Sequence, residues 1–148
     1  MNDKYIVYFI SKIKKRMTEF IEKSLEEKGL DDLVPSYGNI LTVLYDNNGR
    51  LSMKAIGQLI GKDKSTITAL VNKLLKLGYV KKEKCQDDRR VTYIIFTEKG
   101  KAIEGKVDDI SKKVSLTTYK NFSKEEKEIL LKLLKKMYNN FDIEYNVN

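Results

Sequence analysis

The sequence predicts a mostly α-helical protein with one small β-hairpin. Six segments carry apolar residues at spacings of three and four, which is the period of an α-helix, and glycine, proline or capping residues separate these segments. The stretch VTYIIF, residues 91–96, instead alternates and is rich in β-branched and aromatic residues, as strands are. The 148 residues are enough for one domain with a substantial core.

Turn and capping residues separate the first three predicted helices. Gly29 suits the end of the first, whose apolar residues form a long stripe. Pro35 suits the first turn of the second, which stops at the DNNG run of residues 46–49. Ser52 is placed to cap the third. We therefore expect helices over residues 4–28, 35–45 and 53–60, the last with Ala55, Ile56, Leu59 and Ile60 facing inward.

The fourth predicted helix is followed directly by the hairpin. Asp63 suits its N-cap and Gly78 its C-terminal stop. Two short strands are expected next, over residues 79–83 and 91–96, with a charged tip between them. The buried stripe of this helix should consist of Ile67, Leu70, Val71, Leu74 and Leu77.

Two more helices complete the predicted order. Thr97 is placed to cap a fifth, with apolar residues continuing to Val114. Ser123 and Glu126 form an S-x-x-E capping box for a sixth, which runs to Phe141. The long helices at both chain ends carry more apolar surface than the short central elements can cover, so a symmetric second copy is the expected partner. A monomer in which they pack only on each other is the alternative.

Charge is unevenly distributed along the chain. Lys and Arg number 29 and Asp and Glu 21, a net charge of +8. Residues 62–90 hold nine of the basic and four of the acidic residues, so +5 of this charge lies in less than a fifth of the chain. A basic segment of this kind favours a polyanionic partner.

The chain has one cysteine and no histidine. This composition excludes an internal disulfide, a Ser-His-Asp or Cys-His catalytic group and a histidine-containing zinc site. We therefore expect no enzyme activity, no metal and no cofactor. The apolar run at the N-terminus is too short for a signal peptide, nothing later could span a bilayer, and a single cysteine suits a reducing cytoplasm.

A polar helix face beside a basic hairpin is the arrangement by which a winged helix-turn-helix binds double-stranded DNA. Burial of the apolar stripe turns a set of small polar and basic side chains outward. The expected DNA-contacting residues of this helix are Lys64, Ser65, Thr66, Thr68, Ala69, Asn72 and Lys73. Those of the hairpin, or wing, are Lys82, Lys84, Asp88, Arg89 and Arg90.

Three segments resemble the MarR/SlyA family of bacterial winged-helix transcription regulators. They are residues 51–82 (LSMKAIGQLIGKDKSTITALVNKLLKLGYVKK), the D-x-R motif at residues 88–90, and FTEKG at residues 96–100. The resemblance implies a homodimer whose dimerisation helices lie in residues 1–34 and 101–148 and whose DNA-binding lobe is residues 35–100. It also implies a cytoplasmic regulator, here expected to be a repressor of pseudo-palindromic operators, relieved by a small aromatic or anionic ligand.

The resemblance also suggests roles for single residues. It places Arg90 in the minor groove, where a narrow A·T-rich groove attracts a guanidinium. Asp88 would brace that arginine through a charge-assisted hydrogen bond. Many relatives carry arginine where this chain has Ala69, so direct base readout is expected to be softer. Tyr37 is the candidate residue for lining the effector pocket.

Two other classes of function compete with DNA binding. A winged helix can serve as a protein-interaction module without sequence-specific DNA binding, but the basic tip favours DNA. A basic membrane-binding surface is the second, but the charge gathers on a compact hairpin rather than along one helix face.

Overall fold

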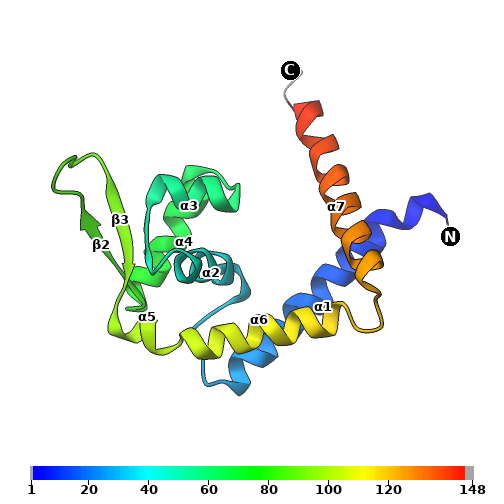
Figure 1. Ribbon diagram of the computed structural model, residues 1–148, viewed down its shortest axis with the longest axis horizontal. Coiled ribbons are helices and arrows are strands. Elements are labelled where there is room, and N and C mark those ends of the chain that lie inside the picture. The colour runs from blue at the N-terminus through cyan, green and yellow to red at the C-terminus, as the bar shows by residue number, and fades with distance from the viewer. Residues whose placement is uncertain (1, 146–148) are drawn as a thin grey trace. The chain divides into compact units, whose positions relative to one another are not determined.

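The computed structural model describes the backbone of residues 2–145 and the side-chain environments of residues 2–141. Within them the chain is mostly helical with a small antiparallel sheet (Figure 1), which confirms the predicted fold class. The elements follow in the order η1 (Asp3–Tyr5), α1 (Ile6–Glu27), η2 (Pro35–Tyr37), α2 (Gly38–Asp46), β1 (Arg50–Ser52), α3 (Met53–Ile60), α4 (Lys64–Lys76), β2 (Val80–Lys84), β3 (Thr92–Phe96), α5 (Glu98–Ala102), α6 (Glu104–Thr118) and α7 (Lys124–Tyr145).

The chain divides into two compact units, Met1–Val114 and Ser115–Asn148. The first contains the sheet, α1 to α5 and most of α6. The second contains the end of α6 and α7, which begins at the predicted capping box: the Ser123 amide donates to Glu126 Oε2 at 2.9 Å, and the Glu126 amide donates to Ser123 Oγ at 3.0 Å. The Tyr119 and Phe122 rings meet edge to face just before this box, with centroids 5.9 Å apart.

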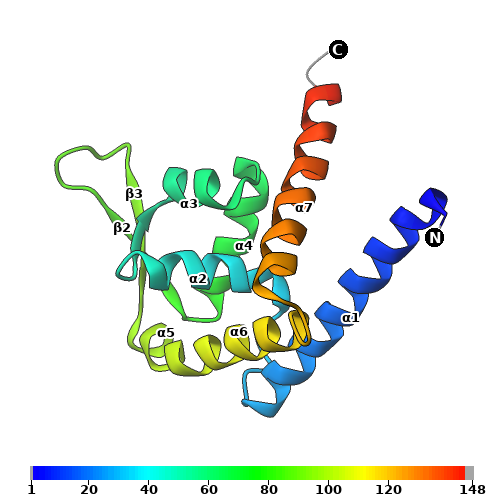
Figure 2. The ribbon, with the colours of Figure 1, turned by 45° about the vertical axis from the view of Figure 1, so that its right-hand side comes forward.

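A single apolar core holds the first unit together. It is built from the inward faces of α2, α3 and α4, one face of the sheet, and the adjoining parts of α1 and α6. α6 lies beside the end of α1 (Figures 1 and 2), where the Lys28 ammonium is 3.3 Å from the Asp109 carboxylate. The fully buried members of this core are Ile40, Leu41, Leu44, Ile56, Ile67, Val71, Leu74, Tyr79 and Ile94.

The sheet has the strand order β1-β3-β2, with both pairings antiparallel. In the register of the hairpin, Val80 lies opposite Phe96 and Lys84 opposite Thr92. The third strand, β1, was not predicted. It is three residues long and pairs with β3, with Arg50 opposite Ile95.

Most of the predicted boundaries and caps are confirmed. Ser52, Asp63 and Thr97 each accept a hydrogen bond from the amide three residues later, as N-caps do. Gly29 and Gly78 end their helices in the left-handed conformation, at φ of 72° and 83°.

Three local predictions were wrong or incomplete. The expected fifth helix is broken at Ile103 into α5 and α6. Leu59 does not face inward and is 58% exposed. The first turn of the second helix, from Pro35, has 3-10 rather than α geometry.

Candidate nucleic-acid interface

The first turn of α4 is held by Asp63. Its Oδ1 accepts the Thr66 amide at 2.7 Å and the Ser65 hydroxyl at 2.8 Å. The Thr66 amide first, and then the Ser65 hydroxyl, keep the pKa of the Asp63 carboxyl below its ordinary value. The cap therefore fixes both the start of the helix and the orientation of the Ser65 side chain.

The two faces of α4 differ as the sequence predicts. Ile67, Val71 and Leu74 are buried, at most 1% exposed, and pack into the core. The opposite face is open to solvent. Its exposed members are Lys64, Ser65, Ala69, Asn72 and Lys73, and its half-buried members are Thr66 and Thr68. All seven predicted recognition-helix residues thus lie on or at the edge of one accessible face.

The wing tip contains a two-point ion pair. Arg90 Nε donates to Asp88 Oδ1 at 3.1 Å, and Arg90 Nη2 donates to Oδ2 at 3.3 Å. The Arg90 amide also donates to Oδ1, at 3.1 Å. The side-chain contact first, and then the amide, hold the pKa of the Asp88 carboxyl below its ordinary value. The arginine side chain is 91% exposed, so Asp88 orients it without burying it.

The register of β2 separates its lysines onto two faces. Side chains alternate along a strand, so Lys82 and Lys84 share the face of Val80, which is buried in the core with Ile94 and Phe96. Lys81 and Glu83 lie on the opposite face. There the Arg50 guanidinium pairs with Glu83 at 2.9 Å and stacks over the Tyr93 ring at 4.1 Å from its centroid. Only Lys82 and Lys84 therefore continue the face of the sheet that packs on the helices.

A groove joins the two predicted surfaces. It has a volume of about 750 Å³, and four cationic side chains from α3, the α3–α4 turn, α4 and the wing line it: Lys54, Lys62, Lys64 and Arg90. Gln58, Ser52 and Thr92 add polar groups, and Met53, Ile67 and Val91 add apolar ones. A groove lined by cations and polar side chains has the chemistry of a phosphate-backbone site.

Sequence reasoning missed the contributions of Lys54, Gln58 and Lys62 to this groove. The signal was weak, because two polar residues one turn apart on a short helix are typical of any solvated face. They gain a role only because they line the same groove as Arg90.

The FTEKG segment secures the root of the wing. The Phe96 ring stacks on Tyr45 with centroids 4.3 Å apart, and the Tyr45 hydroxyl donates to the Gly100 carbonyl at 2.7 Å. The Thr97 amide donates to the Tyr79 carbonyl at 3.1 Å. A Cβ at Gly100 would overlap that same carbonyl and the Phe96 ring, so glycine is required there by close approach.

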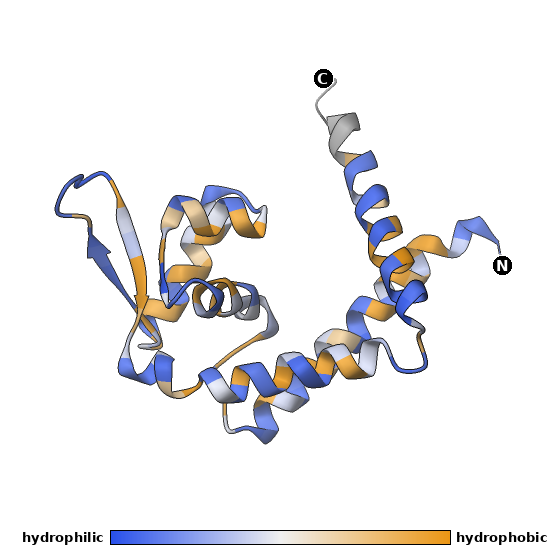
Figure 3. Cartoon of the chain, viewed as in Figure 1, coloured by the Kyte–Doolittle hydropathy of each residue, from blue (hydrophilic) through white to orange (hydrophobic). Residues whose placement is uncertain are grey.

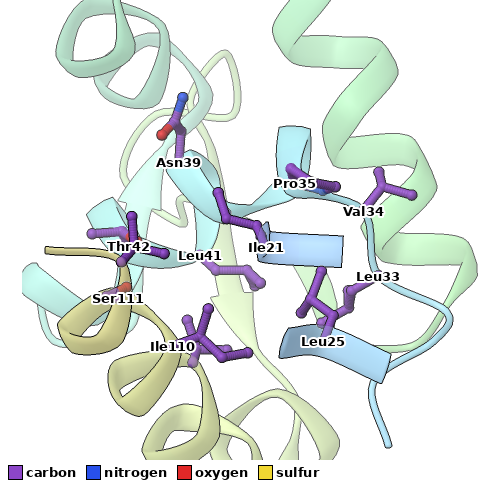
Figure 4. Close-up of a pocket in the computed structure, with 13 residues that line it drawn as sticks. Ile21, Leu25, Leu33, Val34, Pro35, Asn39, Leu41, Thr42, Ile110 and Ser111 are labelled. Carbon is purple, nitrogen blue, oxygen red and sulfur yellow. The ribbon is translucent and has the colours of Figure 1, made fainter. Parts of the chain in front are cut away.

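A cavity of about 250 Å³ lies between α1, α2 and α6 in the first unit (Figure 4). Its lining includes Leu25, Leu33, Leu41 and Ile110. Tyr37, the residue expected to line an effector pocket, is only 7% exposed, belongs to the core cluster and does not line this cavity.

Two further features are absent from the described residues. None of their helices is long and apolar enough to cross a bilayer. They also contain no group of three or more Cys, Asp or Glu side chains placed to hold a metal ion.

A family model described as MarR family matches residues 31–91. The regulator SarZ of Staphylococcus aureus strain USA300, an HTH-type transcriptional regulator, is 32% identical over 105 residues, which cover 71% of this chain and 70% of SarZ. The protein belongs to the MarR family. It is accordingly a winged-helix, DNA-binding transcription regulator, as the sequence predicts.

Solved structures of other proteins share the fold. Reduced AbfR bound to DNA matches with a TM-score of 0.74 at 20% identity, over 93% of each chain. The organohalide-sensing regulator RdhR in its 2,4-dichlorophenol-bound form matches with a TM-score of 0.79 at 21% identity, over 95% of this chain and 82% of RdhR.

Proposed function

We propose that the protein is a repressor that binds pseudo-palindromic operators as a homodimer. The observation that carries the proposal is the continuous cationic groove from α3 through α4 to Arg90, beside the exposed face of α4. In this arrangement α4 enters the major groove, Arg90 reaches the minor groove, and Lys54, Lys62, Lys82 and Lys84 contact phosphates.

Exposed apolar surface supports the homodimer. In the first unit, the N-terminal part of the predicted α1 stripe is open: Ile6, Ile10, Ile13 and Met17 are 37–55% exposed, whereas Leu25 at the other end is 7% exposed. Tyr5, Val7, Tyr8 and Phe9 are also exposed. Figure 3 shows the hydrophobic colour near the start of α1. A run of this kind marks an interaction surface rather than a free helix.

The second unit has a similar surface of its own. The exposed apolar residues of α7 are Ile129, Leu131, Leu133, Leu134, Tyr138 and Phe141. We therefore assign dimerisation to residues 1–34 and 101–148 and DNA binding to residues 35–100. A closed two-fold dimer would place half-sites about one helical turn, ~34–36 Å, apart.

Repression requires only that the dimer occupy its operator, so it needs no surface beyond those described. We propose that a small ligand relieves repression from the cavity between α1, α2 and α6, since Ile21 in its lining lies one helical turn after Met17, the last of the exposed α1 residues. RdhR with 2,4-dichlorophenol is an example of ligand binding in this fold.

A DNA partner and a single cysteine both fit a cytoplasmic location.

The test is selection of bound duplexes from a random-sequence pool, followed by sedimentation of the protein and of its complex. We expect enrichment of a two-fold symmetric site and a dimeric mass. Affinity should fall steeply with salt, because each phosphate contact releases counterions. A monomer at micromolar concentration would contradict the dimer. Failure to enrich any sequence would favour a protein-interaction module instead.

A further inference from the structure

A turn of three residues joins α4 to the wing. Leu77, Gly78 and Tyr79 are the whole connection between the end of α4 and the start of β2. Gly78 has the left-handed conformation, and the amides of Gly78 and Tyr79 donate back into α4, each at 3.1 Å. The last carbonyls of a helix have no donor within it, so those of the turn need donors from another part of the chain.

The first residues of α5 and its N-cap supply those donors to all three carbonyls of the turn. The Lys99 ammonium donates to the Leu77 carbonyl at 2.7 Å. The Thr97 hydroxyl donates to the Gly78 carbonyl, and the Thr97 amide donates to the Tyr79 carbonyl at 3.1 Å. One short segment therefore holds the turn along its whole length.

The Lys99 side chain is in turn placed by the loop between α1 and α2. Asp32 in that loop lies 3.5 Å from the Lys99 ammonium and accepts the Tyr79 hydroxyl at 2.7 Å. The same ammonium lies over the Tyr79 ring, 4.3 Å from its centre. A lysine stem ordinarily samples many rotamers, and these contacts restrict Lys99 to the one that reaches the turn.

We propose that Lys99 is a positioning residue for DNA recognition, which fixes the wing relative to α4 by holding the turn between them. The inference rests on the proposed placement of α4 in the major groove and of Arg90 in the minor groove. Lys99 is not among the residues that line the cationic groove, so it acts through the turn rather than by touching DNA. A turn without this contact would leave the wing to be ordered on binding, which costs affinity.

Distances between two spin labels test this geometry in the absence of DNA. The labels are attached to Lys76→Cys in α4 and Lys84→Cys at the far end of β2, in a Cys85→Ser background; both lysines are exposed. Labelled protein is diluted with an excess of unlabelled protein, so that only distances within one chain contribute. Lys99→Met keeps most of the stem but removes the donor, and should broaden the distance distribution. An unchanged distribution would overturn the proposal.

Two further variants of α5 are the controls for charge and for the donor. Lys101→Met removes the same charge from the same helix, but Lys101 contacts Glu98, at 3.4 Å, and should leave the distribution unchanged. Lys99→Arg retains a cationic donor and should restore the narrow distribution. Broadening by Lys101→Met, or failure of Lys99→Arg to narrow the distribution, would overturn the role of the donor.

Asp32→Asn reaches the same question without changing Lys99. Asparagine can still accept the Tyr79 hydroxyl, but it carries no charge to hold the ammonium. The distribution should therefore broaden, though less than with Lys99→Met, because the Leu77 carbonyl remains as a partner. Melting temperatures of all variants show that each is folded at the temperature of the measurement. A folded Asp32→Asn protein that is broader than Lys99→Met would overturn the proposed order of contacts.

DNA binding by the same variants extends the test to recognition. On duplexes with A·T-rich flanks, Lys99→Met should bind about 3- to 10-fold more weakly, the cost of ordering a side chain on binding. The preference for A·T-rich over G·C-rich flanks should also fall, because Arg90 is no longer held in place. The salt slope should stay that of the wild type, since no phosphate contact is lost. A slope lower by about one would make Lys99 a DNA contact and overturn the proposal.

The combined outcomes separate this inference from the proposed function. Wild-type protein without any flank preference, whose label distances still respond to Lys99→Met, contradicts only the minor-groove placement of Arg90. Wild-type protein with the preference, whose label distances ignore Lys99→Met, contradicts only the inference. Broadened distances with unchanged affinity and flank preference would show that the turn does not matter for recognition, and would also overturn it.

Discussion

The hydroxyl of Tyr79 donates to both carboxylate oxygens of Asp32, at 2.7 and 2.9 Å. Tyr79 is 2% exposed and directly precedes β2, whereas Asp32 lies in the loop between α1 and α2. Lys99 completes the group: its ammonium lies 3.5 Å from Asp32 and 4.3 Å from the centre of the Tyr79 ring. Burial, and then the hydrogen bond to Asp32, raise the pKa of the Tyr79 hydroxyl above its ordinary value. The root of the wing is thereby tied to a loop that also forms one wall of the cavity.

Tyr79→Phe should therefore destabilise the fold. It removes a hydrogen bond to a charged group, which contributes roughly 1.5–3 kcal/mol. Urea unfolding followed by circular dichroism measures the loss. Tyr93→Phe removes a hydroxyl from the sheet while keeping this contact, and is the matched control. Equal stability of the two variants would mean that the Asp32 contact contributes nothing.

The cap at Asp63 should give a pH dependence of known sign. The folded pKa of this carboxyl lies below its ordinary value, so its contribution is complete above the unfolded pKa of about 3.9 and is lost as the pH falls through the folded pKa. Asparagine also caps helices, but it carries no charge, so it lacks the charge-assisted part of these hydrogen bonds and does not titrate. The melting temperature of the wild type should thus exceed that of Asp63→Asn at pH 7. The difference should begin to fall near pH ~4 and vanish once the pH is below the folded pKa. A difference that is constant from pH 7 to 3 would exclude this role.

Local signals were sufficient to predict most of the fold. The N-caps at Ser52, Asp63 and Thr97, and the helix stops at Gly29 and Gly78, depend on side chains and backbone torsions within a few residues. The hairpin was predictable for the same reason, because alternation is visible within one strand.

The structural features that the sequence did not reveal depend on contacts between residues far apart in the chain. β1 has only three residues and exists because it pairs with β3, more than forty positions later. The break at Ile103 lies between Gly100 and Gly105, but neither glycine has the left-handed torsions that end a helix. Gly100 instead fits closely against the Tyr79 carbonyl and accepts the Tyr45 hydroxyl, and the sequence reveals neither contact. The groove formed by Lys54, Lys62 and Arg90 likewise depends on how three elements meet.

The two faces of β2 should differ in their effect on DNA binding. Lys82→Ala should weaken binding to all duplexes similarly and lower the salt slope by about one, as loss of one phosphate contact does. Lys81 carries the same charge one position away but lies on the face of Arg50 and Tyr93. Lys81→Ala should therefore leave the slope nearly unchanged. Fluorescence anisotropy over a salt series distinguishes the two, and identical slopes would contradict the assignment of faces.

Arg90→Ala should cost about 1–3 kcal/mol of binding free energy, the range for a groove contact. The loss should be larger on operators with A·T-rich flanks, because the narrow minor groove there has a stronger negative potential. Arg89→Ala is the control, since its side chain is also exposed at the tip. Binding measured on paired A·T-rich and G·C-rich duplexes tests this. If Arg90→Ala loses the same binding free energy on the A·T-rich and the G·C-rich duplex, Arg90 contacts phosphate rather than the minor groove.

Asp88→Ala separates bracing from simple charge. The substitution makes the wing more basic, so charge counting predicts tighter DNA binding at low salt. The two hydrogen bonds that Asp88 accepts from the Arg90 guanidinium predict weaker binding instead. Without them the arginine is ordered only on binding, and this ordering costs binding free energy. Asp87→Ala removes the same charge from the neighbouring position without breaking this pair. We expect Asp87→Ala to bind slightly more tightly than the wild type and Asp88→Ala to bind more weakly. If both variants bind more tightly at every salt concentration, the wing acts only as a basic patch.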